Sequence, residues 1–133
     1  MKGFLITIVL AAAVLVSSAA YAHHSAAGID RSKSVTVEGV VKAFKWGNPH
    51  SWLDVEVVNS KGGSDLWSFE MNPPAYLVRS GWKSTSVKAG DKVKVTARPF
   101  MNGDPGGIFV SATLPNGQVL ASGQQPSTLP PAQ

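Results

Sequence analysis

The sequence predicts a small, mainly β domain that follows a cleavable export signal. Three observations lead to this prediction. Residues beyond position 34 alternate between apolar and polar types, and turn-forming glycine, proline and asparagine residues separate the alternating runs. An apolar stretch precedes these runs at the N-terminus. One short segment departs from the alternation and carries the signals of a helix.

Residues 1–22 have the layout of a secretory signal peptide. Lys2 supplies the positive charge, the apolar run Phe4–Val16 follows, and Ala20-Tyr21-Ala22 forms a small-residue cleavage site. The apolar run is shorter than the roughly 20 residues that a membrane-spanning helix needs. We therefore expect cleavage rather than a retained anchor. The working form would then be periplasmic or secreted, without a membrane span.

The first predicted strand covers residues 35–46. Its valines at odd positions share one face, whereas Phe44 and Trp46 lie on the other. Gly39 falls inside this strand, where a glycine is typical of a bulge or a sharp bend. A turn at residues 47–49 follows, and the second strand is expected over residues 52–58 in the same alternating pattern.

The later elements follow from turn and helix signals. Two glycines within residues 59–64 predict a hairpin turn into a third strand over 66–71. Asn72-Pro73-Pro74 predicts the start of a helix over 75–80, which Gly81 ends. Further strands are expected over residues 92–97, 108–114 and 118–120, with a glycine-rich loop at 99–107.

This order of elements predicts an OB-like, five- or six-stranded antiparallel barrel with one short helix between strands three and four. Closure of such a barrel removes the open strand edges. A short β-sandwich is the alternative. The predicted organisation is a signal peptide at 1–22, a flexible N-terminal arm at 23–34, the β domain at 35–120 and a disordered tail at 121–133.

Composition narrows the possible functions. The chain has no cysteine, which excludes disulfides, thiolate metal sites and a cysteine nucleophile. Of its 12 basic residues, Lys2 lies in the predicted signal, which leaves eleven basic against eight acidic residues, a net charge of +3. Alternating lysines such as Lys92 and Lys94 are typical of a solvated strand face, so no nucleic-acid partner is expected. A small molecule, a metal ion or a periplasmic protein remains as the partner.

The predicted ligand surface follows from the expected fold. An OB barrel binds through the face of strands two and three and through the loops after strands one and four, which here are residues 47–51 and 99–107. Aromatic rings beside amide groups suit a flat ligand or a protein partner. Alternatively, the rings pack as a small core under a loop. The candidate ligand-binding residues are Trp46, Asn48, His50, Trp52, Met101, Asn102 and Asp104.

The three histidines suggest a second candidate site. His23 and His24 lie at the predicted cleavage site, so processing would place an imidazole at, or within three residues of, a new amino terminus. Nitrogen ligands of this kind favour copper. His50 would complete the metal site if the arm folds back, and Met101 would offer a thioether to Cu(I). The alternative is a disordered arm and a turn histidine that only bonds the backbone.

No arrangement typical of an enzyme stands out. Ser51 follows His50 directly, but neighbouring strand residues point to opposite faces. Asp54 and Glu56 share one face near a lysine, as in a solvated cross-strand ion pair. Glu70 is expected to act as an acceptor at the helix start, with a place on the binding face as the alternative. We therefore expect a non-enzymatic binding module of unknown ligand, with a periplasmic copper-binding protein as the alternative.

Several segments occur together in a recognisable order. They are His-His-Ser at 23–25, Trp-Gly-Asn-Pro-His-Ser-Trp at 46–52, Trp-Ser-Phe-Glu-Met at 67–71, Gly-Trp at 81–82, Lys-Ala-Gly-Asp-Lys-Val at 88–93 and Leu-Pro-Asn-Gly at 114–117. With them, the chain resembles a family of small exported bacterial proteins that is classed as a domain of unknown function. The Asn-Pro-His-Ser-Trp segment is the most specific motif, and the likeness covers nearly all of residues 20–120. The resemblance implies a periplasmic setting and a single β domain. It carries no established activity, so no catalytic residue can be transferred from the family.

Overall fold

The structure is a computed structural model that describes residues 28–123. Six strands and one short helix follow the predicted order closely, and each begins and ends within a few residues of its predicted position. The elements are β1 (Val35–Lys45), β2 (Ser51–Val58), β3 (Ser64–Met71), α3 (Pro74–Arg79), β4 (Lys92–Pro99), β5 (Gly106–Thr113) and β6 (Val119–Ala121).

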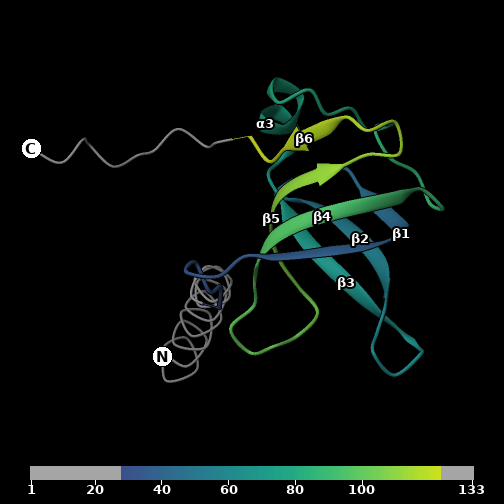
Figure 1. Cartoon of the computed structure of the whole chain (residues 1–133). Coiled ribbons are helices and arrows are strands. Elements are labelled where there is room, and N and C mark those ends of the chain that lie inside the picture. Colours follow the sequence, from purple (N-terminus) through teal and green to yellow (C-terminus); the bar gives the residue numbers. More distant parts are fainter. Residues whose placement is uncertain (1–27, 124–133) are drawn as a thin grey trace, which may run out of the picture.

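The strands form one sheet that closes into a barrel (Figure 1). Its order is β3-β2-β1-β4-β5-β6, and β5 also pairs with β3 to close the ring. The first five strands therefore make the barrel, while β6 adds to β5 outside it. The predicted OB-like fold is confirmed. The expectation of a wholly antiparallel barrel is wrong at one place, because β3 and β5 run parallel.

This closing seam between β3 and β5 is short and built on two glycines. Ser68, Phe69 and Glu70 lie opposite Gly106, Gly107 and Ile108. Both glycines are buried, with φ angles of +138° and +154°. A Cβ atom on Gly106 would overlap the Ser68 carbonyl oxygen, and one on Gly107 would overlap that of Arg98. The absence of a side chain at Gly106 lets β5 approach β3 this closely, and the absence of one at Gly107 lets β5 approach β4.

A β-bulge at Lys42 changes which side chains of β1 face the interior. Val41 pairs with Val55, but the next pair joins Ala43 to Asp54, so Lys42 has no partner on β2. Beyond the bulge the even-numbered side chains point inward. The prediction that Phe44 and Trp46 lie on the face away from the core is therefore wrong, because both rings pack against the buried cluster.

Gly39 has a different role from the bulge that its position suggested. It lies just before Val40, where β1 ends its pairing with β4 and begins its pairing with β2. A Cβ atom at this position would overlap the carbonyl oxygen of Glu56 on β2. The absence of a side chain thus lets β1 approach β2 closely, and the register shift follows three residues later.

The helix α3 covers one end of the barrel, beside β6 (Figure 1). It begins after Pro73 and ends at Arg79. Gly81 adopts a φ of +88°, which glycine accommodates without strain. The chain then places Trp82 in the core, where its side chain is 1% exposed and its Nε1 donates to the Ala121 carbonyl at 2.8 Å.

The buried cluster fills the barrel and extends to the helix. Its members are Val41, Leu53, Val55, Phe69, Met71, Leu77, Trp82, Val87, Val93, Val95, Ala97, Phe109, Ala112, Leu114 and Leu120. Trp82 contacts Phe109 edge-on at a centroid distance of 5.5 Å and Phe44 at 5.7 Å. Among residues 28–123, no helix has the length and hydropathy of a membrane span.

The described ends of the chain are attached to the barrel. Ile29 is buried and pairs with Phe100, and the amide of Asp30 donates to the Pro99 carbonyl at 2.9 Å. At the other end, Nδ2 of Asn72 donates to the carbonyls of residues 122 and 123. These residues belong to the N-terminal arm and the tail, so parts of both segments pack on the domain.

Candidate binding site

His50 is held between two acceptors at one end of the barrel. It ends the β1–β2 loop (residues 46–50), and its Nδ1 lies 3.2 Å from Oε1 of Glu70 and 3.3 Å from the Met71 carbonyl oxygen. Both partners accept hydrogen bonds, so Nδ1 carries the proton in the neutral ring. The Nε2 atom then keeps its lone pair, and no residue among 28–123 donates a hydrogen bond to it.

Hydrogen bonds made by the next residue, Ser51, fix the backbone around His50. The side chain of Ser51 is fully buried, and its Oγ lies 3.3 Å from the amide and 3.4 Å from the carbonyl oxygen of Gly47. The amide of Ser51 donates to the Asn72 carbonyl at 3.4 Å. The Asn48–Pro49 peptide bond is cis. These contacts set the path of the loop and present His50 beside β3.

Glu70 lies between two apolar neighbours on the outer face of the barrel. Trp52 of β2 is its partner on one side, and Ile108 of β5 is its partner on the other. Its side chain is 12% exposed, whereas that of His50 is 42% exposed. The flanking apolar groups reduce the water around the carboxylate, which strengthens its interaction with the imidazole. The site thus combines a fixed imidazole, a shielded carboxylate and a partly exposed indole.

The sequence had suggested that Glu70 acts as an acceptor at the start of the helix, with a place on the binding face as the alternative. The role at the helix start is wrong, because the residue before α3 is Pro73 and no side chain accepts a hydrogen bond at the helix start. The pairing of Glu70 with His50 was missed. A signal for it was present, since counting outward from the hairpin turn at residues 59–63 places Glu70 opposite Trp52.

Two further carboxylates on this outer face form ion pairs with lysine side chains. Nζ of Lys45 lies 2.6 Å from Oδ2 of Asp54, and the Ser68 hydroxyl donates to Oδ1 of Asp54 at 2.8 Å. Nζ of Lys42 lies 2.7 Å from Glu56, as the expected cross-strand pair requires. Hydrogen bonds from Lys42 and from the Ser64 hydroxyl hold the pKa of Glu56 below its ordinary value of 4.5, and the bond from Lys42 has the larger effect.

The remaining candidates of the first loop lie in different surroundings. Asn48 is exposed within the loop, and Trp52 is partly exposed on the outer face beside Glu70. The ring of Trp46 packs edge-on against Phe44 at 5.6 Å and belongs to the rim of the core. The structure therefore brings His50 and Trp52 to one surface with Glu70, while Trp46 supports that end of the barrel from inside.

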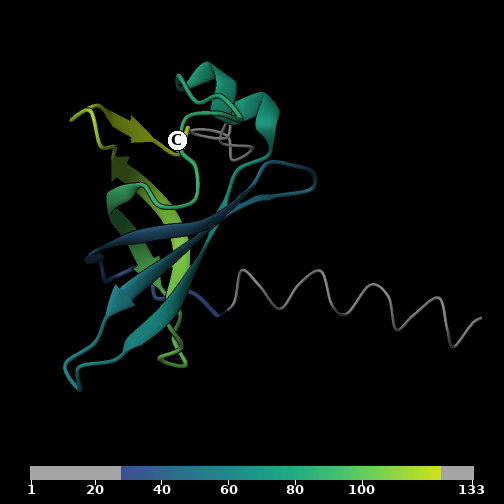
Figure 2. The ribbon, with the colours of Figure 1, turned by 90° about the vertical axis from the view of Figure 1, so that its right-hand side faces the viewer.

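The candidates of the other loop lie elsewhere on the barrel. Figure 2 shows the β4–β5 loop (residues 100–105) at the bottom and the β1–β2 loop at the upper right, near α3. Within the β4–β5 loop, Nδ2 of Asn102 donates to Asp104 at 2.7 Å, and the amide of Asp104 donates back to Asn102 at 3.1 Å. Met101 is 68% exposed. The two predicted loops do not form a shared rim.

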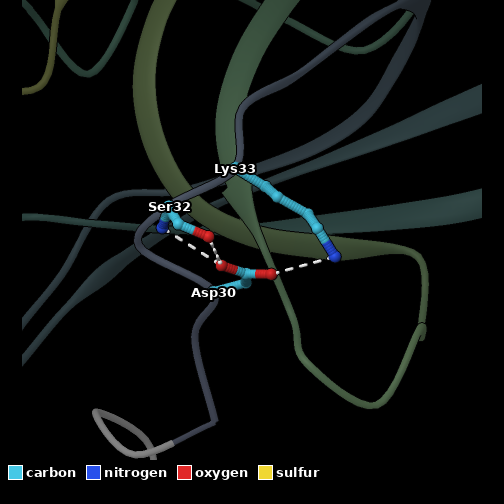
Figure 3. Close-up of polar contacts among 3 residues, drawn as sticks. All are labelled: Asp30, Ser32 and Lys33. Atoms are coloured by element: carbon cyan, nitrogen blue, oxygen red, sulfur yellow. Dashed lines mark hydrogen bonds and ion pairs between the residues drawn. The ribbon is translucent and has the colours of Figure 1, made fainter.

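The described part of the N-terminal arm lies against the β4–β5 loop. The amide of Met101 donates to the Gly28 carbonyl at 2.8 Å. In the turn that follows, Asp30 accepts from the Ser32 hydroxyl at 2.6 Å and pairs with Lys33 at 3.1 Å (Figure 3). These contacts with the Ser32 hydroxyl and with Lys33 hold the pKa of Asp30 below its ordinary value of 3.8, and the hydroxyl has the larger effect.

The proposed copper ligands can be placed only in part. His23 and His24 lie outside the described residues, and His50 is the third member of the predicted set. Across residues 28–123, no group of three or more histidine, aspartate or glutamate side chains is arranged to hold a metal ion. His50 with Glu70 therefore supplies one imidazole, oriented by a carboxylate, to any ligand that approaches from solvent.

Comparison with known proteins places the chain in a family. No curated protein and no solved structure matches it. The model of a family of unknown function, DUF6152, matches residues 11–110, which is more than half of the 133 residues. The match includes β1 to β4 and thus both His50 and Glu70. The predicted membership of a family of unknown function is confirmed: this chain belongs to DUF6152.

Proposed function

We propose that this chain is a non-enzymatic binding module that works outside the cytoplasm, and that its ligand binds on the outer face of β2 and β3 beside His50. One observation carries the proposal, namely that Nδ1 of His50 lies between the Glu70 carboxylate and the Met71 carbonyl. Fixing one ring nitrogen in this way orients the other toward a ligand before binding, which lowers the entropy lost on association.

The neighbouring side chains suggest what the ligand looks like. Trp52 contributes part of an indole ring to the surface, which suits a flat apolar group. The neutral His50 ring offers Nε2 as an acceptor, so it favours a ligand that donates a hydrogen bond. A small molecule with a flat ring and an N–H or O–H group satisfies both demands.

The surroundings of His50 favour binding over catalysis. The neighbouring hydroxyl, that of Ser51, is buried and bonded to Gly47, so it is directed away from the imidazole and from solvent. Nucleophilic catalysis by serine needs a base within hydrogen-bond reach of the hydroxyl. The Glu70–His50 pair therefore acts as an oriented acceptor. The predicted signal at residues 1–22 supports a location outside the cytoplasm.

Benzamide provides a simple probe of this site, because it combines a flat ring with an N–H donor. Its titration into the ¹⁵N-labelled protein should shift the amide signals of His50 and Glu70 and the indole signal of Trp52. Methyl benzoate has a similar ring but no donor and should bind more weakly. The His50→Ala variant should lose the difference between the two probes.

The Asn102→Ala variant serves as the matched control. Asn102 is also polar and exposed, but it lies in the β4–β5 loop, so the variant should bind benzamide as the unmodified protein does. Benzamide shifts that cluster away from His50 would contradict the proposal. Equal binding by the His50→Ala variant would contradict it as well.

Copper binding is a second candidate function, supported by a different contact. Gly28 is bonded to Met101, and His24 precedes Gly28 by four residues. Four extended residues span at most about 14 Å, so the chain length allows the His24 imidazole to reach the exposed Met101 thioether. A thioether and imidazoles together suit Cu(I). His50, in the other loop, is then less suited than Met101 to complete the site.

Competition for Cu(I) with bicinchoninate tests this candidate on the processed protein without an N-terminal tag. Replacing His23 and His24 together should weaken Cu(I) binding strongly, and Met101→Leu should weaken it to a smaller degree. The Met101→Leu variant should bind Cu(II) as before, because a thioether contributes little to that ion. Unchanged Cu(I) affinity in the double histidine variant would rule the candidate out.

A further inference from the structure

A groove with a volume of about 470 Å³ lies on the barrel surface away from His50. Volumes of roughly 300–1,000 Å³ are typical of small-molecule sites. The groove crosses β1, β4 and the end of β5, and it shares no lining residue with the His50 site. Its lining includes Glu38, Val40, Lys92, Lys94, Thr113 and Pro115.

Strand register explains why these residues meet. Val40 of β1 is opposite Lys92 of β4, and Glu38 is opposite Lys94. Thr113 of β5 is opposite Lys94 on its other side. These side chains therefore share the outer face. Beyond β5 the chain turns, with the Leu114 amide donating to the Gln118 carbonyl at 2.8 Å, and the turn places Pro115 at the groove wall.

The charges in the groove are not balanced. Nζ of Lys94 lies 2.7 Å from Oε1 of Glu38, so these two charges offset each other. Lys92 has no carboxylate within 4 Å among residues 28–123. One cation of the groove is therefore available beside apolar atoms of Val40 and Pro115.

We propose that this groove binds a small organic anion, a carboxylate on a short apolar body. The carboxylate would pair with Lys92 and the apolar body would cover Val40 and Pro115. A single free cation next to apolar surface suits such a ligand better than a polyanion, which needs several cations in a row. The site is separate from the His50 surface, so the two proposals stand or fall independently.

Octanoate is a direct probe, and octanol, which has the same number of carbon atoms but no charge, is its matched control. Added to the ¹⁵N-labelled protein, octanoate should shift the amide signals of Gly39, Val93 and Thr113 with a saturable dependence on concentration. Octanol should bind more weakly at the same positions. Raising the ionic strength should weaken octanoate binding and leave octanol binding unchanged, because salt screens only the charged contact.

Two lysine variants complete the test. Lys92→Gln should raise the dissociation constant for octanoate about two- to fivefold, the usual range for an exposed ion pair. Lys61→Gln changes another exposed lysine, in the β2–β3 turn, and should leave the constant unchanged. The proposal is overturned if octanol binds as tightly as octanoate, if both variants weaken binding equally, or if the shifts do not saturate.

Discussion

The ammonium group of Lys45 lies 2.6 Å from Oδ2 of Asp54, whose side chain is only 7% exposed. Asp54 is on the outer face of β2, yet neighbouring strands shield it almost completely from water. A shielded carboxylate needs charged or polar partners, and here Lys45 and the Ser68 hydroxyl supply them. The pair thus links β1, β2 and β3 at the level of the proposed binding surface.

Replacement of Lys45 by methionine should destabilise the protein by about 1–3 kcal/mol, because it leaves a buried carboxylate without its cation. Urea unfolding at pH 7, followed by circular dichroism, measures the change. Lys42→Met is the matched control, since its partner Glu56 is 39% exposed and water can solvate the freed carboxylate. Equal losses in the two variants would show that the shielding of Asp54 has no energetic consequence.

The contacts of His50 predict which ring nitrogen carries its proton. At alkaline pH, a long-range ¹H–¹⁵N spectrum should show Nδ1 protonated and Nε2 unprotonated, because Nδ1 faces the acceptors Glu70 and Met71. Glu70→Ala removes the stronger acceptor and should shift the population toward the Nε2-protonated form. A wild-type spectrum that already shows the Nε2-protonated form would mean that Glu70 does not orient the ring.

The close approach of β1 to β2 predicts different effects for two exchanges of glycine by alanine. Gly39→Ala should destabilise the protein by about 1–3 kcal/mol, since the added methyl group overlaps the Glu56 carbonyl. Gly47→Ala adds a methyl group with no atom within 4 Å and should change the stability by less than about 0.5 kcal/mol. Thermal unfolding of both variants checks this. Similar melting temperatures for the two would contradict the described packing.

The turn before β4 predicts a pH dependence of stability. The side chain and the backbone amide of Lys88 both donate hydrogen bonds to Asp91. These bonds hold the pKa of this carboxyl below its ordinary value of 3.8, and the side-chain bond has the larger effect. Since the folded state lowers this pKa, the contribution is complete above about pH 3.8 and disappears as the pH falls through the lower, folded value.

Asp91→Asn should therefore lower the urea midpoint at neutral pH, and the difference from the unmodified protein should shrink as the pH falls below 3.8. Lys88→Gln removes the partner instead of the carboxylate and should show the same trend. Urea titrations between pH 2 and pH 7 supply the measurement. Parallel curves for variant and unmodified protein over this whole range would refute the linkage.

Most of the fold could be predicted from local patterns, because each strand alternates and each turn contains its own signal. The helix before Gly81 is an example, since prolines begin it and a glycine at positive φ ends it. The inward faces of β1 could not be predicted beyond Lys42. A bulge reverses the alternation there, and the sequence around it looks like an uninterrupted strand.

The candidate site could be predicted only in part, because some of its residues lie far apart in the sequence. His50 and Trp52 were identified because they lie together in one conspicuous segment. Glu70 lies 20 residues beyond His50, and only the register of β2 with β3 brings the two together. The separation of the two loops depends on the whole barrel. No local sequence pattern could therefore show that Met101 lies far from His50.

The glycine seam between β3 and β5 has a consequence for the order of folding. It joins Ser68 to Gly106, 38 positions apart, through only three residue pairs. The hairpins β1–β2–β3 and β4–β5 form from near neighbours, whereas the seam needs both of these units in place, as does the β1–β4 pairing, whose partners lie 52 to 62 positions apart. We therefore expect ring closure to be a late step of folding, and the native lifetime to depend on how rarely the seam opens.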